Sequence, residues 1–277
     1  MAHTTLVSTE QLETNLASWR PFDCRHDLAK PELGEQQYRE AHIPGALFAH
    51  LDRDLSAPKT GHNGRHPLPD RGAFIAWLGQ QGLEPGDQVV CYDGASGAMA
   101  ARLWWMLRWA GHDAAAVLDG GLAKWLHEGR PITREMPRFA HRSYPVKPCA
   151  AQNVQAKALE TRREKLLLID ARAPARFRGE QEPIDPVAGR IPGARNRFSN
   201  DNLSADGTFK RPEELNKEFL AVLGDHRPGE VVNYCGSGVA ACHNLLAMEV
   251  AGLPGAKLYA GSWSEWIADP ARPREQG

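Results

Sequence analysis

Residues 231–244 read VVNYCGSGVAACHN, and this stretch indicates how the chain folds. The apolar run VVNY predicts a short buried strand. Gly236 and Gly238 then predict a tight turn, because glycine adopts backbone conformations that other residues avoid. From Gly238 to Val250 the apolar spacing predicts a helix. A strand, a turn and a helix in this order form the repeating unit of an α/β protein.

Four landmarks occur twice in the chain, in the same order in each half. The first pair is two apolar runs, which end in Asp23-Cys24-Arg25 and in Asp170-Ala171-Arg172. The second pair is HIPGA (42–46) with RIPGA (190–194), and the third is VVCYDG (89–94) with VVNYCG (231–236). The fourth pair is LDGGLAKW (118–125) with YAGSWSEW (259–266). Such self-similarity indicates that one domain has been duplicated. The length of 277 residues also suits two domains of roughly 150 residues each.

The domain boundaries follow from the repeat and from a stretch between its copies. Residues 128–150 contain four prolines and several basic residues, which is typical of an exposed connection. We therefore predict an N-terminal domain over 1–127, a linker over 128–150 and a C-terminal domain over 151–277.

Short apolar runs alternate with helical patterns in both copies. The predicted strands are 89–92, 115–119, 166–170, 231–234 and 257–260, and the predicted helices are 98–109, 122–127, 213–222, 238–250 and a short one carrying Trp263 and Trp266. This alternation predicts that each domain is a mainly parallel sheet flanked by helices. In such sheets the functional crevice lies at the carboxyl ends of the strands.

Composition excludes several classes of function. Lysine and arginine total 33 against 34 acidic residues, so no basic excess points to nucleic acid. The sequence has no apolar stretch long enough to cross a bilayer, and MAHTTLVSTE does not look like a signal peptide. Five cysteines without a C-x-x-C suit a reducing compartment and do not suggest a metal site. We expect a soluble, cytoplasmic protein that binds no metal, no nucleic acid and no membrane.

Cys235 is the candidate nucleophile. Gly236 and Gly238 let backbone N–H groups turn inward around it, and the following helix adds N–H groups and a partial positive charge. A cysteine in such a cradle is expected to be held as its thiolate and to act on anionic substrates. The alternative is a buried cysteine that only fills space.

The first copy serves as an internal control for Cys235. Its loop, YDGASGAMAARL (92–103), is one residue longer and has Asp93 where Cys235 stands. An aspartate cannot act as a sulfur nucleophile, and the scaffold does not require a cysteine at this place. The N-terminal domain is therefore predicted to lack the catalytic cysteine that the C-terminal domain carries.

The duplicated architecture, the two I-P-G-A motifs, the matched Gly–Trp endings and the loop CGSGVAA resemble the tandem-domain rhodaneses. These are the thiosulfate and 3-mercaptopyruvate sulfurtransferases, and the resemblance covers nearly the whole chain. It implies two rhodanese-like α/β domains and no cofactor. In that family the cysteine takes a sulfane sulfur from a small anionic donor and becomes a persulfide. The sulfur then passes to cyanide or to a thiol, for example that of a thioredoxin-like protein.

The resemblance also implies substrate-binding residues. Arg176, in ARFRGE, falls where the family binds the anionic end of the donor, and a guanidinium suits a carboxylate or a sulfonate-like group. The alternative is an exposed arginine paired with Glu180. The loop around the donor would be formed by Gly236, Gly238, Val239 and Ala240, with Ala240 where threonine is usual.

A proton-handling group is implied in the same way. In mercaptopyruvate enzymes the loop serine, here Ser237, is joined by an aspartate and a histidine of the N-terminal domain. Asp52 and His66 match these by position, and as a set the three could move a proton on or off the donor. The alternatives are a turn serine, a helix-capping acid and a loop histidine beside prolines.

The sequence leaves the donor open between thiosulfate and 3-mercaptopyruvate. C-G-S-G-V is the form of the mercaptopyruvate enzymes, whereas thiosulfate enzymes tend to place cations after the cysteine. Mercaptopyruvate enzymes usually carry a second arginine in an E-P-R context, where this chain has Ile184. Arg190, which replaces the usual histidine of the second H-I-P-G, could substitute for it.

Two other classes of function compete with a sulfurtransferase. A cysteine-dependent phosphatase or arsenate reductase would need an arginine six positions after the cysteine, where Ala241 stands. A non-catalytic rhodanese-like binding module would be expected to lose the cysteine, as the first copy has done. Because Cys235 is present, a sulfurtransferase is the favoured function.

Overall fold

The computed structural model describes residues 2–94, 96–149, 151–162 and 165–277. They form two compact units, each around its own sheet. Unit 1 comprises Met1–Ala57, Pro69–Ala150 and Ala205–Thr208, and unit 2 comprises Pro58–Leu68, Ala151–Ser204 and Phe209–Gly277. A short segment of the N-terminal half, Pro58–Leu68, therefore belongs to unit 2. The boundaries predicted at residues 127 and 150 stay a prediction.

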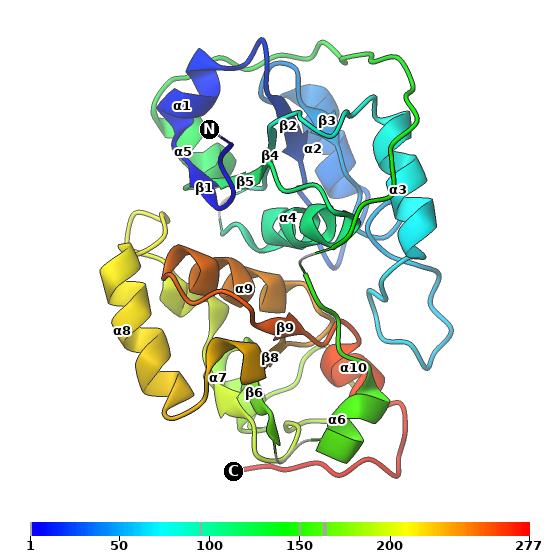
Figure 1. Cartoon of the computed structure of the whole chain (residues 1–277), viewed down its shortest axis with the longest axis vertical. Coiled ribbons are helices and arrows are strands. Elements are labelled where there is room, and N and C mark those ends of the chain that lie inside the picture. Colours follow the sequence, from blue (N-terminus) through cyan, green and yellow to red (C-terminus); the bar gives the residue numbers. More distant parts are fainter. Residues whose placement is uncertain (1, 95, 150, 163–164) are drawn as a thin grey trace. The chain divides into compact units, whose positions relative to one another are not determined.

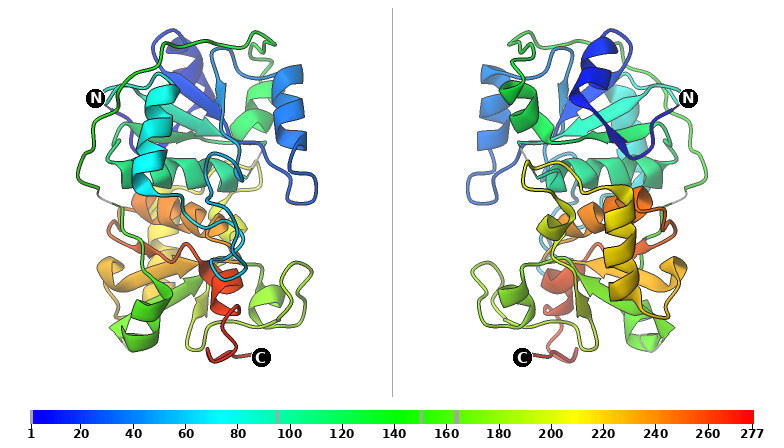
Figure 2. Two further views of the ribbon diagram at one scale, coloured as in Figure 1. Left: turned by 90° about the vertical axis from the view of Figure 1, so that its right-hand side faces the viewer. Right: turned by 90° about the vertical axis from the view of Figure 1, so that its left-hand side faces the viewer.

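Unit 1 contains a five-stranded parallel sheet with the strand order β1-β5-β4-β2-β3 (Figure 1). Its strands are β1 (Leu6–Val7), β2 (Arg20–Asp23), β3 (Leu47–Phe48), β4 (Val89–Tyr92) and β5 (Ala115–Leu118). Its helices are α1 (Thr9–Thr14), α2 (Leu33–Glu40), α3 (Arg71–Gln80), α4 (Ala98–Ala110) and α5 (Gly121–His127). The helices α1 and α5 cover one face of this sheet and α4 covers the other (Figures 1 and 2).

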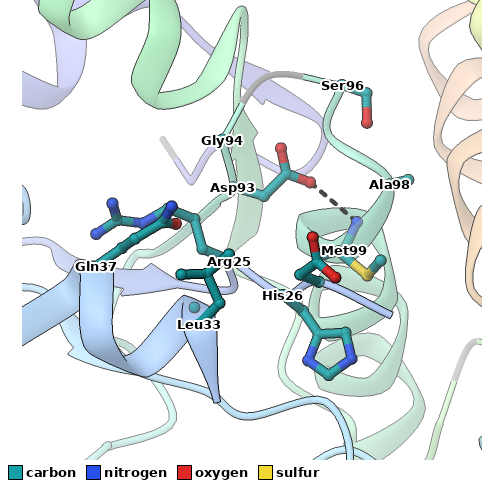
Figure 3. Close-up of a pocket in the computed structure, with 11 residues that line it drawn as sticks. Arg25, His26, Leu33, Gln37, Asp93, Gly94, Ser96, Ala98 and Met99 are labelled. Atoms are coloured by element: carbon teal, nitrogen blue, oxygen red, sulfur yellow. Dashed lines mark hydrogen bonds between the residues drawn. The ribbon is translucent and has the colours of Figure 1, made fainter. Parts of the chain in front are cut away.

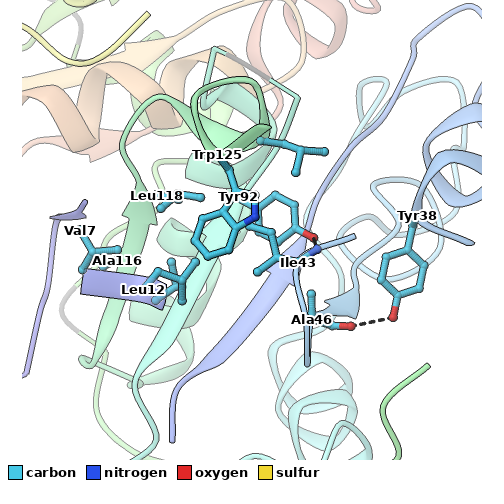
Figure 4. Close-up of a cluster of buried hydrophobic side chains, with 11 residues drawn as sticks. Val7, Leu12, Tyr38, Ile43, Ala46, Tyr92, Ala116, Leu118 and Trp125 are labelled. Carbon is cyan, nitrogen blue, oxygen red and sulfur yellow. Dashed lines mark hydrogen bonds between the residues drawn. The ribbon is translucent and has the colours of Figure 1, made fainter. Parts of the chain in front are cut away.

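Strand β4 shows why this sheet is buried on both faces. All four of its residues are buried, and alternate side chains point to opposite faces. Val90 and Tyr92 pack in one core cluster with Leu12 of α1 and Trp125 of α5 (Figure 4). The Tyr92 hydroxyl also accepts a hydrogen bond from the Ile43 N–H at 3.2 Å, which holds the HIPGA turn against the sheet.

Unit 2 repeats the plan with a four-stranded parallel sheet in the order β7-β6-β8-β9. Its strands are β6 (Leu167–Asp170), β7 (Arg195–Asn196), β8 (Val231–Tyr234) and β9 (Lys257–Leu258). Its helices are α6 (Ala156–Arg162), α7 (Pro174–Phe177), α8 (Pro212–Leu223), α9 (Ala240–Val250) and α10 (Ser262–Trp266), with 3-10 turns η2 (Ser199–Asn202) and η3 (Pro228–Glu230). The Tyr234 hydroxyl accepts from the Ile191 N–H at 3.2 Å, as Tyr92 does for the matching turn of unit 1.

The fold class predicted from the repeat is confirmed, because both sheets are parallel and helices flank them. The boundaries of the predicted elements differ from the observed ones by at most two residues. Helix α9 begins at Ala240, two residues later than predicted, because Gly238 has a φ of +78° and cannot belong to a right-handed helix. Among the residues described, no helix is long and apolar enough to cross a membrane.

Candidate active site

Cys235 lies at the carboxyl end of β8, a strand with a neighbour on each side in the sheet of unit 2. Its backbone is held by the start of α10. The Cys235 N–H donates to Ser262 Oγ at 3.1 Å, and the Trp263 N–H donates to the Cys235 carbonyl at 2.9 Å. The next carbonyl, of Gly236, accepts from the Ser264 N–H at 3.0 Å. These bonds fix the direction in which the loop leaves the strand.

The loop turns backbone N–H groups towards the sulfur. The N–H groups of Ser237 and Gly238 point at Cys235 Sγ, with nitrogen–sulfur distances of 3.5 and 3.2 Å. Oriented N–H groups of this kind favour a negative charge on the atom that they surround. Glycine is needed at position 238, where φ is +78° and an added β-carbon would lie 2.3 Å from the Ala260 carbonyl oxygen.

His66 contacts Ser237, a residue of the cysteine loop. His66 Nδ1 is 2.7 Å from Ser237 Oγ, and both residues are buried. The histidine comes from the Pro58–Leu68 segment, and the neighbouring Arg65 N–H donates to Ser264 Oγ at 3.0 Å. A hydroxyl hydrogen-bonded to an imidazole can give up or take a proton at neutral pH. The turn-serine alternative does not account for this contact between residues 171 positions apart.

Arg176 lies on α7 and pairs with two acids of the following loop. Its Nη2 is 2.6 Å from Glu182 Oε1 and 3.1 Å from Asp185 Oδ2. Glu180 instead pairs with Arg178, so the alternative of an exposed Arg176–Glu180 pair is wrong.

A second guanidinium at the site was not found by sequence reasoning. A β-carbon added to Gly236 would lie 2.7 Å from Arg65 Nη2 and 3.5 Å from Arg176 Nη2, so both cations face the residue next to Cys235. Arg65 also pairs with Asp185. The signal that could have found it is its place directly before His66, which was already a candidate residue.

The acids around these cations differ in how they are held. Burial would raise the pKa of Glu182, but hydrogen bonds from Arg176 and from the N–H groups of Asp185 and Ile184 outweigh it and lower the pKa below the ordinary 4.5. Burial raises the pKa of Asp185, against the opposing charge of Arg65. The site therefore keeps one firmly ionised acid and one whose charge is costly to hold.

Arg190 does not substitute for the missing arginine. Its guanidinium pairs with Glu275, donates to the Gly277 carbonyl and lies 4.6 Å above the Phe177 ring. It is engaged with residues near position 275 rather than with the cysteine loop, so that part of the sequence interpretation is wrong.

Asp52 lies in unit 1, whereas Ser237 and His66 lie in unit 2. Its carboxylate is 3.8 Å from His26 Nε2, and its N–H donates to His50 Nδ1 at 3.1 Å. Its predicted role with Ser237 stays a prediction. These two histidines and Asp52 lie close enough to share an ion, but His50 Nδ1 accepts N–H groups, so the neutral ring carries its proton on Nε2. That arrangement does not fit a metal ligand.

The matching loop of unit 1 holds a carboxylate where unit 2 has a thiol. The Asp93 carboxylate accepts N–H groups of Gly97 and Met99, both at 2.9 Å, and of Ala100 at 3.3 Å. It lies at a pocket of about 340 Å³ that Arg25 also lines (Figure 3). The cradle of unit 1 thus binds an anion that is part of the chain itself, which supports anion binding by the equivalent loop of unit 2.

Fold and site together define a duplicated α/β protein with a cradled cysteine in one of its two copies. A model of the rhodanese-like domain matches residues 8–128 and 154–269. The chain therefore belongs to the rhodanese family and carries the domain twice.

Curated relatives and solved structures are similar to this chain over most of its length. A probable 3-mercaptopyruvate sulfurtransferase of Pseudomonas aeruginosa is 47% identical over 100% of both chains. A putative thiosulfate sulfurtransferase, SseB, of Mycobacterium tuberculosis is 40% identical over 92% of this chain and 90% of its own. Among solved structures, the 3-mercaptopyruvate sulfurtransferase from Leishmania major has a TM-score of 0.86 and 31% identity, covering 98% of this chain and 75% of that one. The corresponding values for SseA from Escherichia coli are 0.79 and 28%, with coverage of 94% and 99%.

Proposed function

We propose that the protein is a sulfurtransferase that holds a transferred sulfur as a persulfide on Cys235 and uses 3-mercaptopyruvate as its preferred donor. Relatives named for sulfur transfer, alike over the full chain, support the reaction class. The contact between Ser237 and His66, 2.7 Å long and buried beside the cysteine loop, supports the donor.

The two donors differ in whether they require a proton. When the Cys235 thiolate attacks the sulfur of 3-mercaptopyruvate, the carbon–sulfur bond breaks and its electron pair forms the enolate of pyruvate. The enolate must take a proton to leave as pyruvate, and Ser237 with His66 can deliver one. Attack on thiosulfate breaks a sulfur–sulfur bond and releases sulfite, which leaves as a dianion without a proton. A buried hydroxyl–imidazole pair therefore serves the first donor and has no task with the second.

The cations and the cradle have roles with either donor. Arg176 and Arg65 bind the anionic end, because planar guanidinium groups pair well with carboxylates and sulfonate-like groups. The backbone of Gly236, Gly238, Val239 and Ala240 shapes the loop around the reacting sulfur. The N–H groups that point at Sγ also stabilise negative charge on the persulfide after transfer.

Thiosulfate is the second candidate donor, and the pair of guanidinium groups beside Gly236 favours it. Two cations suit a leaving group with two negative charges. Both donors can therefore load Cys235, with 3-mercaptopyruvate the faster one.

The acceptor is a thiophilic group that attacks the outer sulfur of the persulfide and regenerates the Cys235 thiolate. Cyanide serves in an assay, and a thiol serves in a reducing, cytoplasmic setting. We expect a thioredoxin-like protein to supply that thiol.

The experiment compares kcat/KM for both donors, with cyanide as acceptor, in the wild type and in Ser237→Ala. Removing a proton-transfer group costs on the order of 10²- to 10⁴-fold, so the variant should lose about that much with 3-mercaptopyruvate. Its activity with thiosulfate should stay within a few-fold of wild type. Cys149→Ala is the matched control, because that cysteine is exposed, and it should change neither donor. Equal losses with both donors would show that Ser237 only supports the loop.

A further inference from the structure

Asp185 lies between the two guanidinium groups of the site. Its Oδ2 accepts from Arg176 Nη2 at 3.1 Å, and its Oδ1 accepts from Arg65 Nη1. Only 2% of its side chain is exposed. One enclosed carboxylate therefore bridges two cations that come from segments more than 100 positions apart in the sequence.

Both of those cations face the cysteine loop. Nitrogen atoms of both guanidinium groups lie 2.7 to 3.7 Å from the position that a β-carbon of Gly236 would take. Gly236 directly follows Cys235, so an anion that reacts with the sulfur must enter the field of both arginines. Asp185 neutralises part of that field in the structure described.

Asp185 is held differently from its neighbour Glu182. The Glu182 carboxylate accepts backbone N–H groups of Ile184 and Asp185, at 3.1 and 3.0 Å, besides its bonds to arginine. The hydrogen bonds described for the Asp185 carboxylate go to the two guanidinium groups alone. Burial, which raises the pKa of Asp185, is a further cost of keeping it charged there. An incoming anion can offer the same two guanidinium groups an equivalent partner, whereas nothing outside the chain replaces the backbone bonds of Glu182.

We propose that Asp185 is an internal counter-anion of the donor site, and that the anionic end of the donor takes its place between Arg65 and Arg176. This inference rests on the proposed function, because it concerns how that reaction binds its donor. Donor affinity is then set by competition between two anions for the same pair of cations. Asp185 keeps the two arginines together before the donor arrives and weakens the binding of every anionic donor.

Asp185→Asn tests the competition, because asparagine keeps the shape and one hydrogen-bond acceptor but not the charge. Removing a like charge a few ångströms from the donor anion should lower KM for both donors by about 10-fold. If Asp185 only ordered the two arginines, Asp185→Asn would instead raise KM. Asp185→Glu keeps the charge and should leave KM at or above the wild-type value.

Two controls separate this effect from general disturbance of the loop. Glu182→Gln should lower KM less than Asp185→Asn does, because backbone N–H groups hold Glu182 and the donor does not take its place. Arg178→Ala removes an exposed arginine that pairs with Glu180, and it should leave KM unchanged. An unchanged or raised KM in Asp185→Asn would overturn the inference.

A readout without turnover distinguishes failure of the inference from failure of the proposed function. Sulfate should protect Cys235 from alkylation by iodoacetamide, and protection should need about 10-fold less sulfate in Asp185→Asn. Labelling is read at the Cys235 peptide, since the exposed Cys149 reacts as well. If neither donor loads Cys235 but sulfate protects the variant more tightly, the proposed function fails and the anion competition stands. If the donors load Cys235 and sulfate protects both proteins equally, the competition is wrong.

Discussion

The protein should be more stable with glycine at position 262, in place of Ser262, than with alanine. This reverses the usual order of these two residues in a helix. Among the residues described, Ser262 is the one non-glycine residue with positive φ, at +56°. The repeat places Gly121 at the equivalent position of unit 1, and its φ is also +56°. Ser262 accepts the Cys235 N–H at 3.1 Å and donates to the Tyr259 carbonyl at 2.9 Å. The copy with the cysteine therefore keeps a hydroxyl at a place where glycine fits the backbone better.

The expected magnitudes follow from these contacts. Ser262→Ala leaves the buried Cys235 N–H without its partner, which costs about 1–3 kcal/mol. It also keeps the left-handed backbone, whose cost for a residue with a β-carbon is roughly 1–2 kcal/mol. Ser262→Gly loses the same hydrogen bonds but relieves that strain, and glycine has about 0.5–1 kcal/mol of extra entropy to lose on folding. The glycine variant should therefore be more stable than the alanine variant by about 1 kcal/mol.

The assay is the midpoint of thermal unfolding for both variants under one set of conditions. A difference of 1 kcal/mol corresponds to about 2–4 °C in a protein of this size. Gly121→Ala is the matched control, since it adds the strain to unit 1 without removing a hydroxyl, and it should lower the midpoint. An alanine variant as stable as the glycine variant, or more stable, would refute the reasoning. Both Ser262 variants should also lower kcat, because Cys235 loses the bond that directs its backbone.

Three further predictions concern the same site. Gly238→Ala should abolish activity and lower the unfolding midpoint, because φ is +78° and its β-carbon would lie 2.3 Å from the Ala260 oxygen; kinetics and thermal unfolding check both effects. The fold holds the pKa of Glu182 below 4.5, so its ionised form stabilises the protein above that pH and the contribution is lost as the pH falls through the folded pKa. Urea unfolding at neutral and acid pH should therefore show a smaller loss of stability on acidification in Glu182→Gln than in the wild type. Incubation with donor should lower iodoacetamide labelling of the Cys235 thiol as its persulfide forms, and it should leave labelling of the exposed Cys149 unchanged. Peptide mass analysis measures both, and a loss of labelling at both cysteines would contradict this prediction.

Much of the fold could be predicted from local pattern. The runs VVCY and VVNY are buried on both faces and carry little but apolar residues, so they indicate strands of a parallel sheet directly. Strands β1, β3 and β7 have two residues each and were not predicted, because such short runs have no periodicity. The start of α9 was misplaced, because the composition of the loop does not reveal that Gly238 is left-handed.

The site could be predicted only where one stretch of sequence carries the chemistry. Cys235 and its glycines are contiguous, and Asp93 in the other copy provides a comparison inside the chain. Arg65 was missed because it reaches Gly236 from a segment 171 positions away, and no local pattern records such a contact. The same holds for Ser262, whose importance lies in a backbone angle that sequence letters do not show.

The central claim is that Cys235 carries the transferred sulfur, and the mass of the intact protein tests it most directly. After incubation with 3-mercaptopyruvate or thiosulfate and removal of the donor, the wild type should gain the mass of one sulfur atom. Cyanide should then remove it and yield thiocyanate. Cys235→Ala should gain nothing, while Cys149→Ala should load like the wild type. A wild type that gains no sulfur from either donor, or a Cys235→Ala variant that still gains one, would contradict the account.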